Sequence, residues 1–195
     1  ATPLAPQLHQ APPPTKAEVI GLISQINPKL SPHRLDVIAR TLLDEAEKRK
    51  IDPILVIAIG DKESDWRNIS VVKTNDYGYL QVHYAAEPHL RSYQVRDLVD
   101  ENGEPDRKKL MIPVINIRRG IQELAWWRGQ CQDRGGSAHW RCSCPEWDGS
   151  GPVKWWGHYK WGYRQKNMEY ANSIQSRIEL IRAKLARMRA NKVQS

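Results

Sequence analysis

Apolar residues recur at helical spacing soon after a proline-rich start. The stretch VIGLISQI follows Thr15 and Glu18, which have the spacing of a capping box. Ser31-Pro32 indicates a second helix start, and the pattern that follows runs to about Lys50. The apolar face of this second stretch is formed by Leu35, Ile38, Ala39, Leu42, Leu43 and Ala46. The pattern predicts two amphipathic helices.

A third stretch differs because it is apolar on nearly every side. Asp52 and Pro53 repeat the start signal, and the residues through Ile59 are almost all apolar. We expect a helix from Pro53 to about Trp66, buried at the centre of the domain. From Gln165 onward, a single apolar stripe predicts a long terminal helix. The residues of this stripe are Tyr170, Ile174, Ile178, Ile181, Leu185 and Met188.

Two segments interrupt the helical pattern. TNDYGYLQV at 74–82 places turn-forming residues before alternating aromatic and aliphatic ones, which predicts a turn leading into a short strand or hairpin. The first 16 residues hold five prolines and no apolar period, so residues 1–16 are expected to form a flexible tether. Residues 17–195 are expected to form one domain, because 195 residues with 40% hydrophobic content suffice for one good core.

The net charge of the chain indicates which classes of partner it can bind. Thirty Lys and Arg residues against 22 Asp and Glu give +8, which favours nucleic acid, an acidic membrane surface or an acidic wall polymer. The longest apolar run, ILVIAIG at 54–60, is far too short for a membrane span. The outer face of the terminal helix is basic; such a face is usually only solvated, and contact with anionic wall polymer or lipid is the alternative. Its basic residues are Arg177, Arg182, Lys184, Arg187, Arg189 and Lys192.

Glu63 is the first candidate for chemistry. It falls at the C-terminal end of the third predicted helix, where the helix dipole and any burial both raise the proton affinity of a carboxylate. A general acid that works near neutral pH needs this property. The commoner explanation is a solvated charge at a helix end. The segments that follow decide between the two.

These segments carry a family resemblance. ES at 63–64 and GYLQ at 78–81 resemble the "ES" and "GLMQ" motifs of the soluble lytic transglycosylases, lysozyme-like enzymes that cleave peptidoglycan. PVINIRRGIQEL at 113–124 is similar to the family's "NI..G..YL" helix. HYKWG at 158–162 resembles its "AYNGG" segment, and YANSI at 170–174 resembles the start of its terminal helix. Counting ES and GYLQ together as one pattern, the four motifs occur in the family's order.

The resemblance implies a mainly α, lysozyme-like fold with a small β-hairpin beside a sugar-binding cleft. It implies a peptidoglycan lytic transglycosylase that cleaves the MurNAc–GlcNAc β-1,4 bond and leaves 1,6-anhydro-MurNAc ends, with no cofactor and no metal. Glu63 would act first as acid and then as base, while the substrate's own N-acetyl group and 6-hydroxyl supply the rest. The chain departs from the family at Tyr79 and Leu80, which replace Leu and Met, and at Lys160, which replaces Asn.

Several side chains are expected to bind glycan near Glu63. Gln81 has both donor and acceptor atoms, which suit an N-acetyl or hydroxyl group. Ser64 is expected beside the carboxylate or reaching the sugar, or else as an ordinary helix-end hydroxyl. Tyr159 resembles the family tyrosine whose hydroxyl holds the catalytic glutamate. The full set expected to bind substrate is Ser64, Gly78, Tyr79, Gln81, Asn116, Tyr159, Trp155 and Trp156.

A second carboxylate would change the reaction. Asp65 is only two residues from Glu63 and points to another face if the helix continues that far. Asp76, inside the turn, is the better candidate, although a turn aspartate more often bonds its own backbone. Either one could activate water, and the enzyme would then be a muramidase of goose-type lysozyme character.

Tryptophan gathers in one part of the chain. Seven of the eight Trp residues lie between positions 126 and 161, within or beside an insertion expected at about 126–157. Indole faces pack on sugar rings, so Trp155 and Trp156 are expected to form the wall of the sugar groove. At least half of the tryptophans are expected instead to pack within the insertion and hold its loops together.

The cysteines lie in the same insertion. Cys131 is expected to pair with either Cys142 or Cys144, as fits an enzyme outside the cytosol. Zinc binding with His139 and His158 is the rival hypothesis, which the lack of paired C-x-x-C spacing disfavours. Reduced cysteines without a role are the remaining alternative.

Other functions stay open at this point. A non-catalytic glycan-binding or virion module would keep the lysozyme-like shape without turnover. Nucleic-acid binding would give salt-sensitive retention on DNA, but no nucleic-acid motif is recognised. A peptidoglycan enzyme is expected to be a monomer that works outside the cytoplasm, periplasmic or secreted, or associated with a virion if a phage encodes it.

Overall fold

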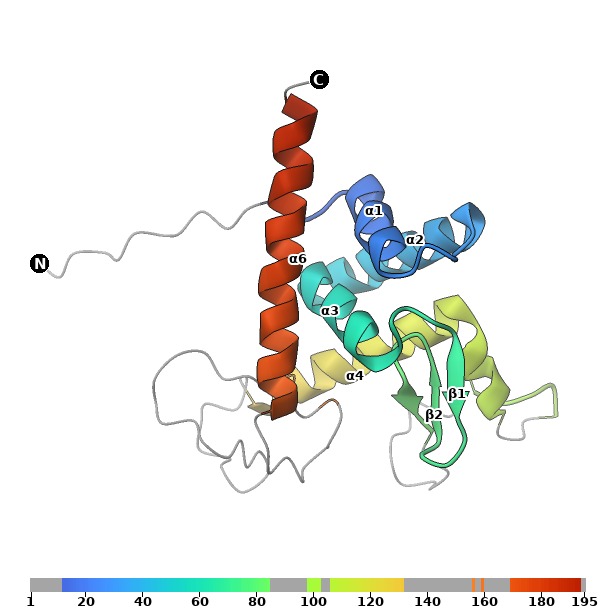
Figure 1. Ribbon diagram of the computed structural model, residues 1–195. Helices are drawn as coiled ribbons and strands as arrows, with labels where there is room; N and C mark the ends of the chain where they lie inside the picture. Colours follow the sequence, from blue (N-terminus) through green and yellow to red (C-terminus); the bar gives the residue numbers. More distant parts are fainter. Residues whose placement is uncertain are drawn as a thin grey trace, which may run out of the picture.

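A computed structural model describes residues 12–84, 98–102, 106–131, 156, 159 and 169–193 (Figure 1). Within these residues a small antiparallel sheet accompanies a set of helices, which confirms the mainly α fold expected from the sequence. The helices are α1 Lys16–Ile26, α2 Pro32–Arg49, α3 Pro53–Ser64, η1 Arg107–Met111, α4 Pro113–Cys131 and α6 Glu169–Val193. The strands are β1 Ile69–Val71, β2 Asp76–Gly78 and β3 Val82–His83.

The first three helices begin where the sequence predicts. Thr15 caps α1 in a complete capping box with Glu18. The Ser31 hydroxyl accepts a hydrogen bond from a backbone N–H of the first turn of α2. The Asp52 carboxylate does the same for Ile54 at the start of α3, at 2.9 Å. These caps satisfy donors that a helix leaves without partners at its N-terminus.

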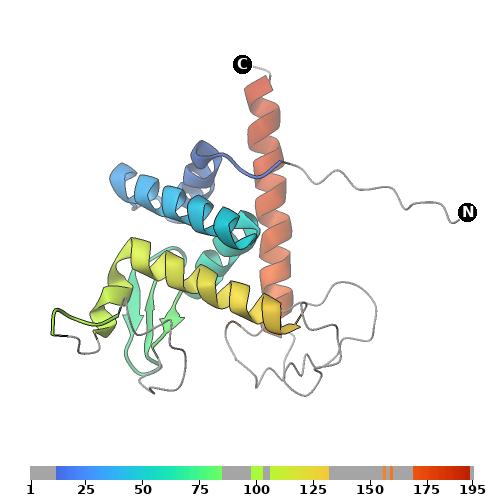
Figure 2. The ribbon, with the colours of Figure 1, turned by 180° about the vertical axis from the view of Figure 1, so that it is seen from behind.

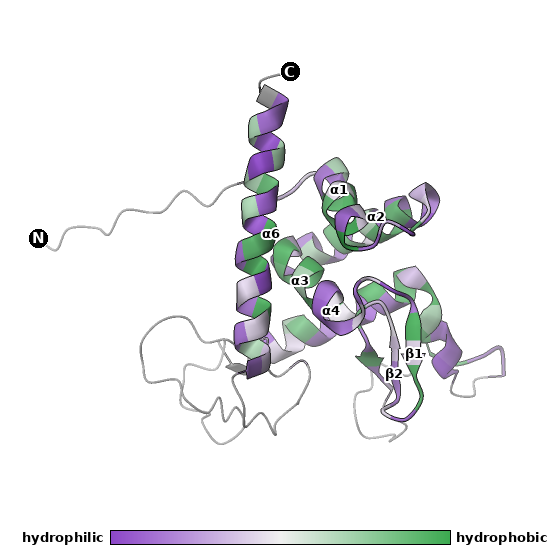
Figure 3. Ribbon diagram, viewed as in Figure 1, coloured by the Kyte–Doolittle hydropathy of each residue, from purple (hydrophilic) through white to green (hydrophobic). Residues whose placement is uncertain are grey.

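Helix α3 lies at the centre of the core. Residues 54–60 are all buried, and α6 packs along α3 while α2 packs against α1 and α4. Figure 3 shows α3 largely in the hydrophobic colour. Figures 1 and 2 place α6 and the sheet on opposite sides of α3. The central, buried position predicted for this helix is confirmed.

The end of α3 differs slightly from the prediction. The helix stops at Ser64 rather than near Trp66, because Asp65 and Trp66 adopt left-handed φ values of 50° and 54°. The chain then folds Trp66 back on the helix, and its indole N–H donates to the Ile57 carbonyl at 3.1 Å. A Cβ atom on Gly60 would lie 2.4 Å from this indole, so only glycine permits the contact. The fold-back fixes the last turn of α3, which carries Glu63.

The hairpin expected within 74–82 is part of a three-stranded sheet in the order β1-β2-β3. Both pairings are antiparallel, with Ile69 opposite Gly78 and Asp76 opposite His83. The Asn68 side chain donates to the Met111 carbonyl at 2.9 Å, which ties the start of the sheet to η1. The sheet therefore has a fixed position against the helices.

The described part of helix α6 begins at Glu169, and residues 165–168 of the predicted helix lie outside the described residues. Its apolar stripe is in the core as expected, with Met188 only partly buried. Its basic residues are partly used within the molecule. Arg177 pairs with Asp61 at 3.1 Å, Arg182 with Asp52 at 2.8 Å and Arg189 with Glu18 at 2.9 Å. Half of the basic face proposed for anionic polymer thus binds carboxylates of the same chain.

Part of the segment expected to be a tether is held in place. Arg189 donates to the carbonyls of Pro12 and Pro13, each at 3.1 Å, and Pro14 is buried. Lys16 is already in α1. The described residues 12–16 therefore belong to the folded domain, and residues 1–11 lie outside the described residues.

The insertion is described only at its edges. Trp126 and Trp127, expected at its start, are part of α4, where their rings meet edge to face at 4.5 Å between centroids. Trp127 is buried in the core. The remaining tryptophans of the insertion except Trp156, as well as Cys142, Cys144 and the side chain of Cys131, lie outside the described residues. The disulfide stays a prediction.

Two further findings concern the described part of the chain. None of its helices is long and apolar enough to cross a membrane. Within the same residues, no group of three or more His, Cys, Asp or Glu side chains is placed to hold a metal ion.

Candidate active site

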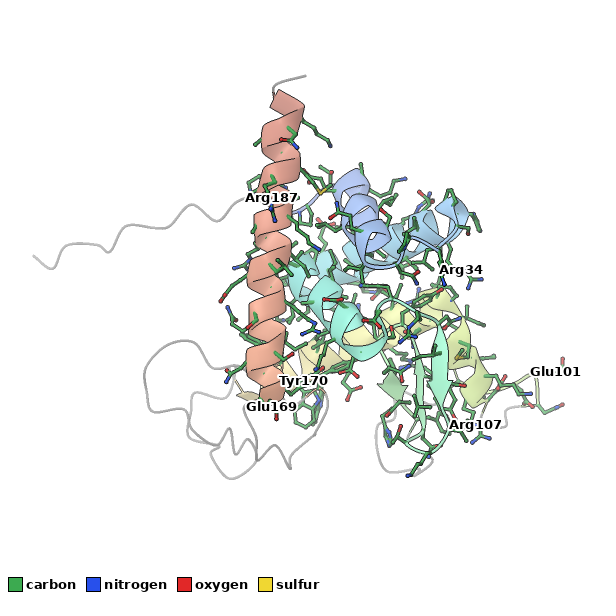
Figure 4. The ribbon with its side chains drawn as sticks, in the orientation of Figure 1. Arg34, Glu101, Arg107, Glu169, Tyr170 and Arg187 are labelled. Carbon is green, nitrogen blue, oxygen red and sulfur yellow. The ribbon has the colours of Figure 1, made fainter. Side chains whose placement is uncertain are left out.

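Glu63 lies in the last turn of α3 and is half-buried. The hydroxyl of Tyr170 donates a hydrogen bond to Glu63 Oε1 at 2.5 Å. Tyr170 comes from the first turn of α6, at the lower end of that helix in Figure 4. Burial raises the pKa of Tyr170 well above its ordinary value, and the nearby charge of Glu63 raises it further. The phenol therefore keeps its proton and remains a donor to the carboxylate.

This geometry corrects the expectation for Tyr159. Its hydroxyl donates to the Leu80 carbonyl at 2.8 Å, so its single proton is committed to the backbone. Tyr159 is buried, and burial is the main cause that raises its pKa. The hydroxyl that holds Glu63 is that of Tyr170. Tyr159 instead anchors the turn after β2, close to the site.

Two residues expected to bind substrate hold the backbone of that turn. Ser64 is buried, and its hydroxyl lies 2.6 Å from the Tyr79 carbonyl and 3.3 Å from the Gly60 carbonyl. Asn116 is 0% exposed. Its Oδ1 accepts from the Leu80 N–H at 2.9 Å, and its Nδ2 donates to the Tyr77 carbonyl at 2.7 Å. Both side chains are turned to the interior, contrary to the expectation that they meet the glycan.

Gly78 and Tyr79 are interior residues as well. Gly78 has a φ of +77°, and a Cβ atom there would lie 2.3 Å from Asn116 Nδ2. Glycine is therefore required by both conformation and space. Tyr79 is fully buried, its ring 6.1 Å from that of Trp66, and Arg34 donates to its hydroxyl at 3.3 Å. Both residues shape the turn from the interior of the protein.

Gln81 is the residue of this motif with an atom left for a ligand. Its φ is 47°, and its Nε2 donates to the Ile69 carbonyl at 3.0 Å and to the Gly78 carbonyl at 2.7 Å. The amide nitrogen is thus committed to the sheet. The residue is 9% exposed, so only a small part of it can meet substrate. We expect its Oε1 to be the atom that accepts from a glycan hydroxyl or N–H.

The two suspected second carboxylates, Asp65 and Asp76, each have a partner within the protein. Asp65 caps the end of α3, is 63% exposed at its side chain and pairs with Arg67 at 3.1 Å. Asp76 lies in β2, and its Oδ1 is 3.0 Å from His83 Nδ1 across the sheet. That bond is the main cause that raises the pKa of His83 above its ordinary value. Asp76 is close enough for its charge to act on Tyr159.

The sequence analysis missed a different carboxylate, Glu123 on α4. It is 9% exposed, and its charge contributes to the raised pKa values of Tyr159, Tyr170 and His83. Glu123 therefore acts electrostatically on the tyrosine that bonds Glu63 and on the tyrosine that holds the turn after β2. The signal was present in the sequence, because positions 116, 120, 123 and 127 follow one another at helical spacing and share the buried face of α4.

Of the two tryptophans expected to form the wall of the sugar groove, the structure describes one. Trp155 lies outside the described residues. The indole N–H of Trp156 donates to the Ala171 carbonyl at 3.2 Å, in the first turn of α6, and its ring packs partly buried against the core. Trp156 thus helps to fix the turn that carries Tyr170. This is a contact within the protein, and the place expected for Trp156 in the wall of the sugar groove stays a prediction.

The arrangement provides one half-buried carboxylate, Glu63, with a phenol donor, Tyr170. Such a group can give and take a proton at one position.

Comparison with known proteins identifies a family for most of this region. The family model described as transglycosylase SLT domain matches residues 41–162. The match includes Glu63, Gln81, Glu123 and Tyr159, whereas Tyr170 lies outside it. Comparison with curated proteins gave no match, and comparison with solved structures gave none either.

Proposed function

Because the chain belongs to the transglycosylase SLT domain family, whose members are peptidoglycan lytic transglycosylases, we propose that Glu63 cleaves the MurNAc–GlcNAc β-1,4 bond and leaves a 1,6-anhydro-MurNAc end. The substrate of the family is the cell wall, so we expect the protein to work outside the cytoplasm. The observation that carries the proposal is the Tyr170–Glu63 hydrogen bond at the end of the buried central helix.

The first step is proton transfer. Protonated Glu63 gives its proton to the glycosidic oxygen, the bond from that oxygen to C1 of MurNAc breaks, and GlcNAc leaves with a new hydroxyl. Positive charge that develops at C1 is shared by the N-acetyl group of the same sugar. In this step Glu63 is a general acid.

The second step uses the carboxylate that remains. Glu63 takes the proton from the 6-hydroxyl of MurNAc, and the oxygen bonds to C1 of the same sugar, which closes the anhydro ring. The proton is then back on Glu63, and no water is consumed. An internal hydroxyl held near C1 has a very high effective concentration, so the reaction needs no second carboxylate to activate water.

Tyr170 supports both steps. Its hydroxyl stays protonated because burial raises its pKa, so it donates to Glu63 throughout the cycle. A donor stabilises the ionised carboxylate that exists between the two steps. Since the hydrogen bond joins α3 to α6, it also fixes the direction of the carboxyl group.

Digestion of purified peptidoglycan followed by mass spectrometry tests the proposal. A transglycosylase gives products one water lighter than those of a hydrolase. Glu63→Gln should lower turnover by about 100-fold or more, because proton transfer is the chemistry, while sedimentation with peptidoglycan should still show binding. Glu179→Gln, which removes an exposed charge from α6, should be as active as the wild type. A Glu63→Gln variant with turnover like that of the wild type would refute the proposal.

One observation favours hydrolysis as the second candidate. Glu123 lies close enough to act on both tyrosines around Glu63, and a second carboxylate can activate water in a glycosidase. The same digestion decides between the two, since hydrolysis leaves free reducing ends instead of anhydro ends.

A further inference from the structure

We propose that Trp156 is a positioning residue for the reaction, which holds the first turn of α6 so that the Tyr170 hydroxyl reaches Glu63. The inference rests on the proposed function, because it gives Trp156 a task in the proton transfer by Glu63. It assigns Trp156 no direct contact with the sugar, and the effect of Trp156 on the chemistry passes through Tyr170.

The contact that carries the inference is the hydrogen bond from Trp156 to α6. The indole N–H donates to the Ala171 carbonyl at 3.2 Å, and Ala171 is 0% exposed. Ala171 directly follows Tyr170, whose hydroxyl donates to Glu63 Oε1 at 2.5 Å. Two successive residues of one turn are therefore tied, one through its backbone to Trp156 and one through its side chain to Glu63.

The position of Tyr170 in its helix makes such a tie important. Tyr170 lies in the first turn of α6, at the lower end of the helix in Figure 4. The first turn of a helix has fewer internal hydrogen bonds than the middle, so its place depends more on contacts with neighbouring elements. The ion pair of Arg177 with Asp61, at 3.1 Å, is seven residues further along α6, which is about 10 Å along the helix axis. A bond at Ala171 constrains the Tyr170 hydroxyl more closely than one two turns away.

Trp156 is itself held in place. Its ring packs partly buried against the core, and three residues later Tyr159 donates to the Leu80 carbonyl at 2.8 Å. Three residues span at most about 11 Å, so the chain keeps these two anchor points close together. One anchor is on the first turn of α6 and the other is on the turn that contains Gln81. Trp156 and Tyr159 thus connect the two elements on which the proposed site depends.

The geometry also sets the size of the expected effect. The oxygen atoms of Tyr170 and Glu63 are 2.5 Å apart, and a displacement of about 1 Å would take this pair out of hydrogen-bonding range. A misplacement of that size can lower the rate about 100-fold. The loss of one neutral hydrogen bond leaves the packing of α6 in place, so we expect a partial displacement and a decrease in kcat of about 10-fold.

The test is a double-mutant cycle measured as kcat and KM on soluble peptidoglycan fragments. Trp156→Phe removes the indole N–H and should lower kcat about 10-fold, with a change in KM of less than about twofold. In the Tyr170→Phe background the same substitution should lower kcat less than about twofold, because no hydroxyl is left to be positioned. This non-additivity is the result expected from a residue that acts through Tyr170.

Three results would overturn the inference. They are an unchanged kcat in Trp156→Phe, an equal loss of kcat in both backgrounds, and a loss confined to KM, which would mean that the indole meets the glycan. Arg189→Gln is the control for lowered stability, because it removes an ion pair with Glu18 from the other end of α6. It should leave kcat unchanged in both backgrounds when the assay is run well below Tm.

A second variant serves if Trp156→Phe does not fold. Benzothienylalanine at position 156 keeps the size of the tryptophan ring and has sulfur in place of the N–H. It should reproduce the loss of kcat in the wild-type background and its absence in Tyr170→Phe. A fully active benzothienylalanine protein would show that the hydrogen bond to Ala171 has no role in positioning.

These outcomes are separate from those of the proposed function. If Glu63→Gln is inactive, anhydro ends form and the losses in the cycle are additive, only the role of Trp156 fails. If Glu63→Gln is as active as the wild type, the proposed function fails together with the inference.

Discussion

Asn116→Ala should destabilise the fold and leave glycan binding by the folded fraction nearly unchanged. In the wild type this amide joins α4 to the turn after β2 through two buried hydrogen bonds, to the Leu80 N–H and the Tyr77 carbonyl. Alanine removes both partners, and the side chain is too short to replace them. The turn contains Gln81 and is tied to Ser64, next to Glu63.

The size of the effect follows from the groups left without partners. An unsatisfied buried backbone group costs about 1–3 kcal/mol, and here there are two. Alanine is the better helix former by about 0.5 kcal/mol, which offsets a small part. We expect a loss of about 3–4 kcal/mol in the free energy of unfolding, which for a chain of this size lowers Tm by about 10 °C.

Urea and thermal unfolding followed by circular dichroism measure the loss. Asn191→Ala, which removes an exposed amide from the end of α6, is the control and should change stability by less than about 0.5 kcal/mol. The opposite pattern would refute the reasoning. If Asn116→Ala is as stable as the wild type and binds glycan more weakly, Asn116 meets the substrate, as the motif resemblance implies.

Two further predictions concern side-chain pairs. Tyr170→Phe removes the donor to Glu63 and should lower kcat with little change in KM. Tyr159→Phe removes a hydrogen bond to the backbone and should lower Tm more than kcat. Steady-state kinetics and melting curves of both variants test this, and a larger loss of kcat in Tyr159→Phe than in Tyr170→Phe would contradict it. The hydrogen bond from Arg189 lowers the pKa of Glu18 from 4.5 to about 2, so this pair stabilises the fold above pH 4.5 and is lost as the pH falls toward 2. Arg189→Gln should therefore melt at a lower temperature at neutral pH, and its Tm should depend less on pH in that window; equal slopes for both proteins would contradict the assignment.

Local features of the fold could be predicted because they depend on residues close in sequence. The caps at Thr15, Ser31 and Asp52 and the apolar period behind them set where α1 to α3 begin. The continuous apolar run of α3 predicted a central position, because a helix that is apolar on all sides is stable only when it is buried. The candidate acid Glu63 followed from the motif and from its place at the end of that helix.

The surroundings of Glu63 could not be predicted in the same way. Tyr170 is 107 positions from Glu63. The sequence does not show which of the two tyrosines donates to Glu63 and which, like Tyr159, donates to the Leu80 carbonyl. The motif residues Ser64 and Asn116 carry polar groups that suit a ligand or the backbone equally well. Only the positions of α3 and α4 relative to the sheet and the turn after β2 show that backbone carbonyls bind both side chains.

The sequence by itself determined the helical class of the chain, the order of its motifs and the glutamate at the end of the central helix, because periodicity and capping act over one or two turns. The tertiary structure decided which tyrosine holds that glutamate and which motif residues face inward. These contacts join segments far apart in the chain, and the free energy that selects them comes from packing of whole elements.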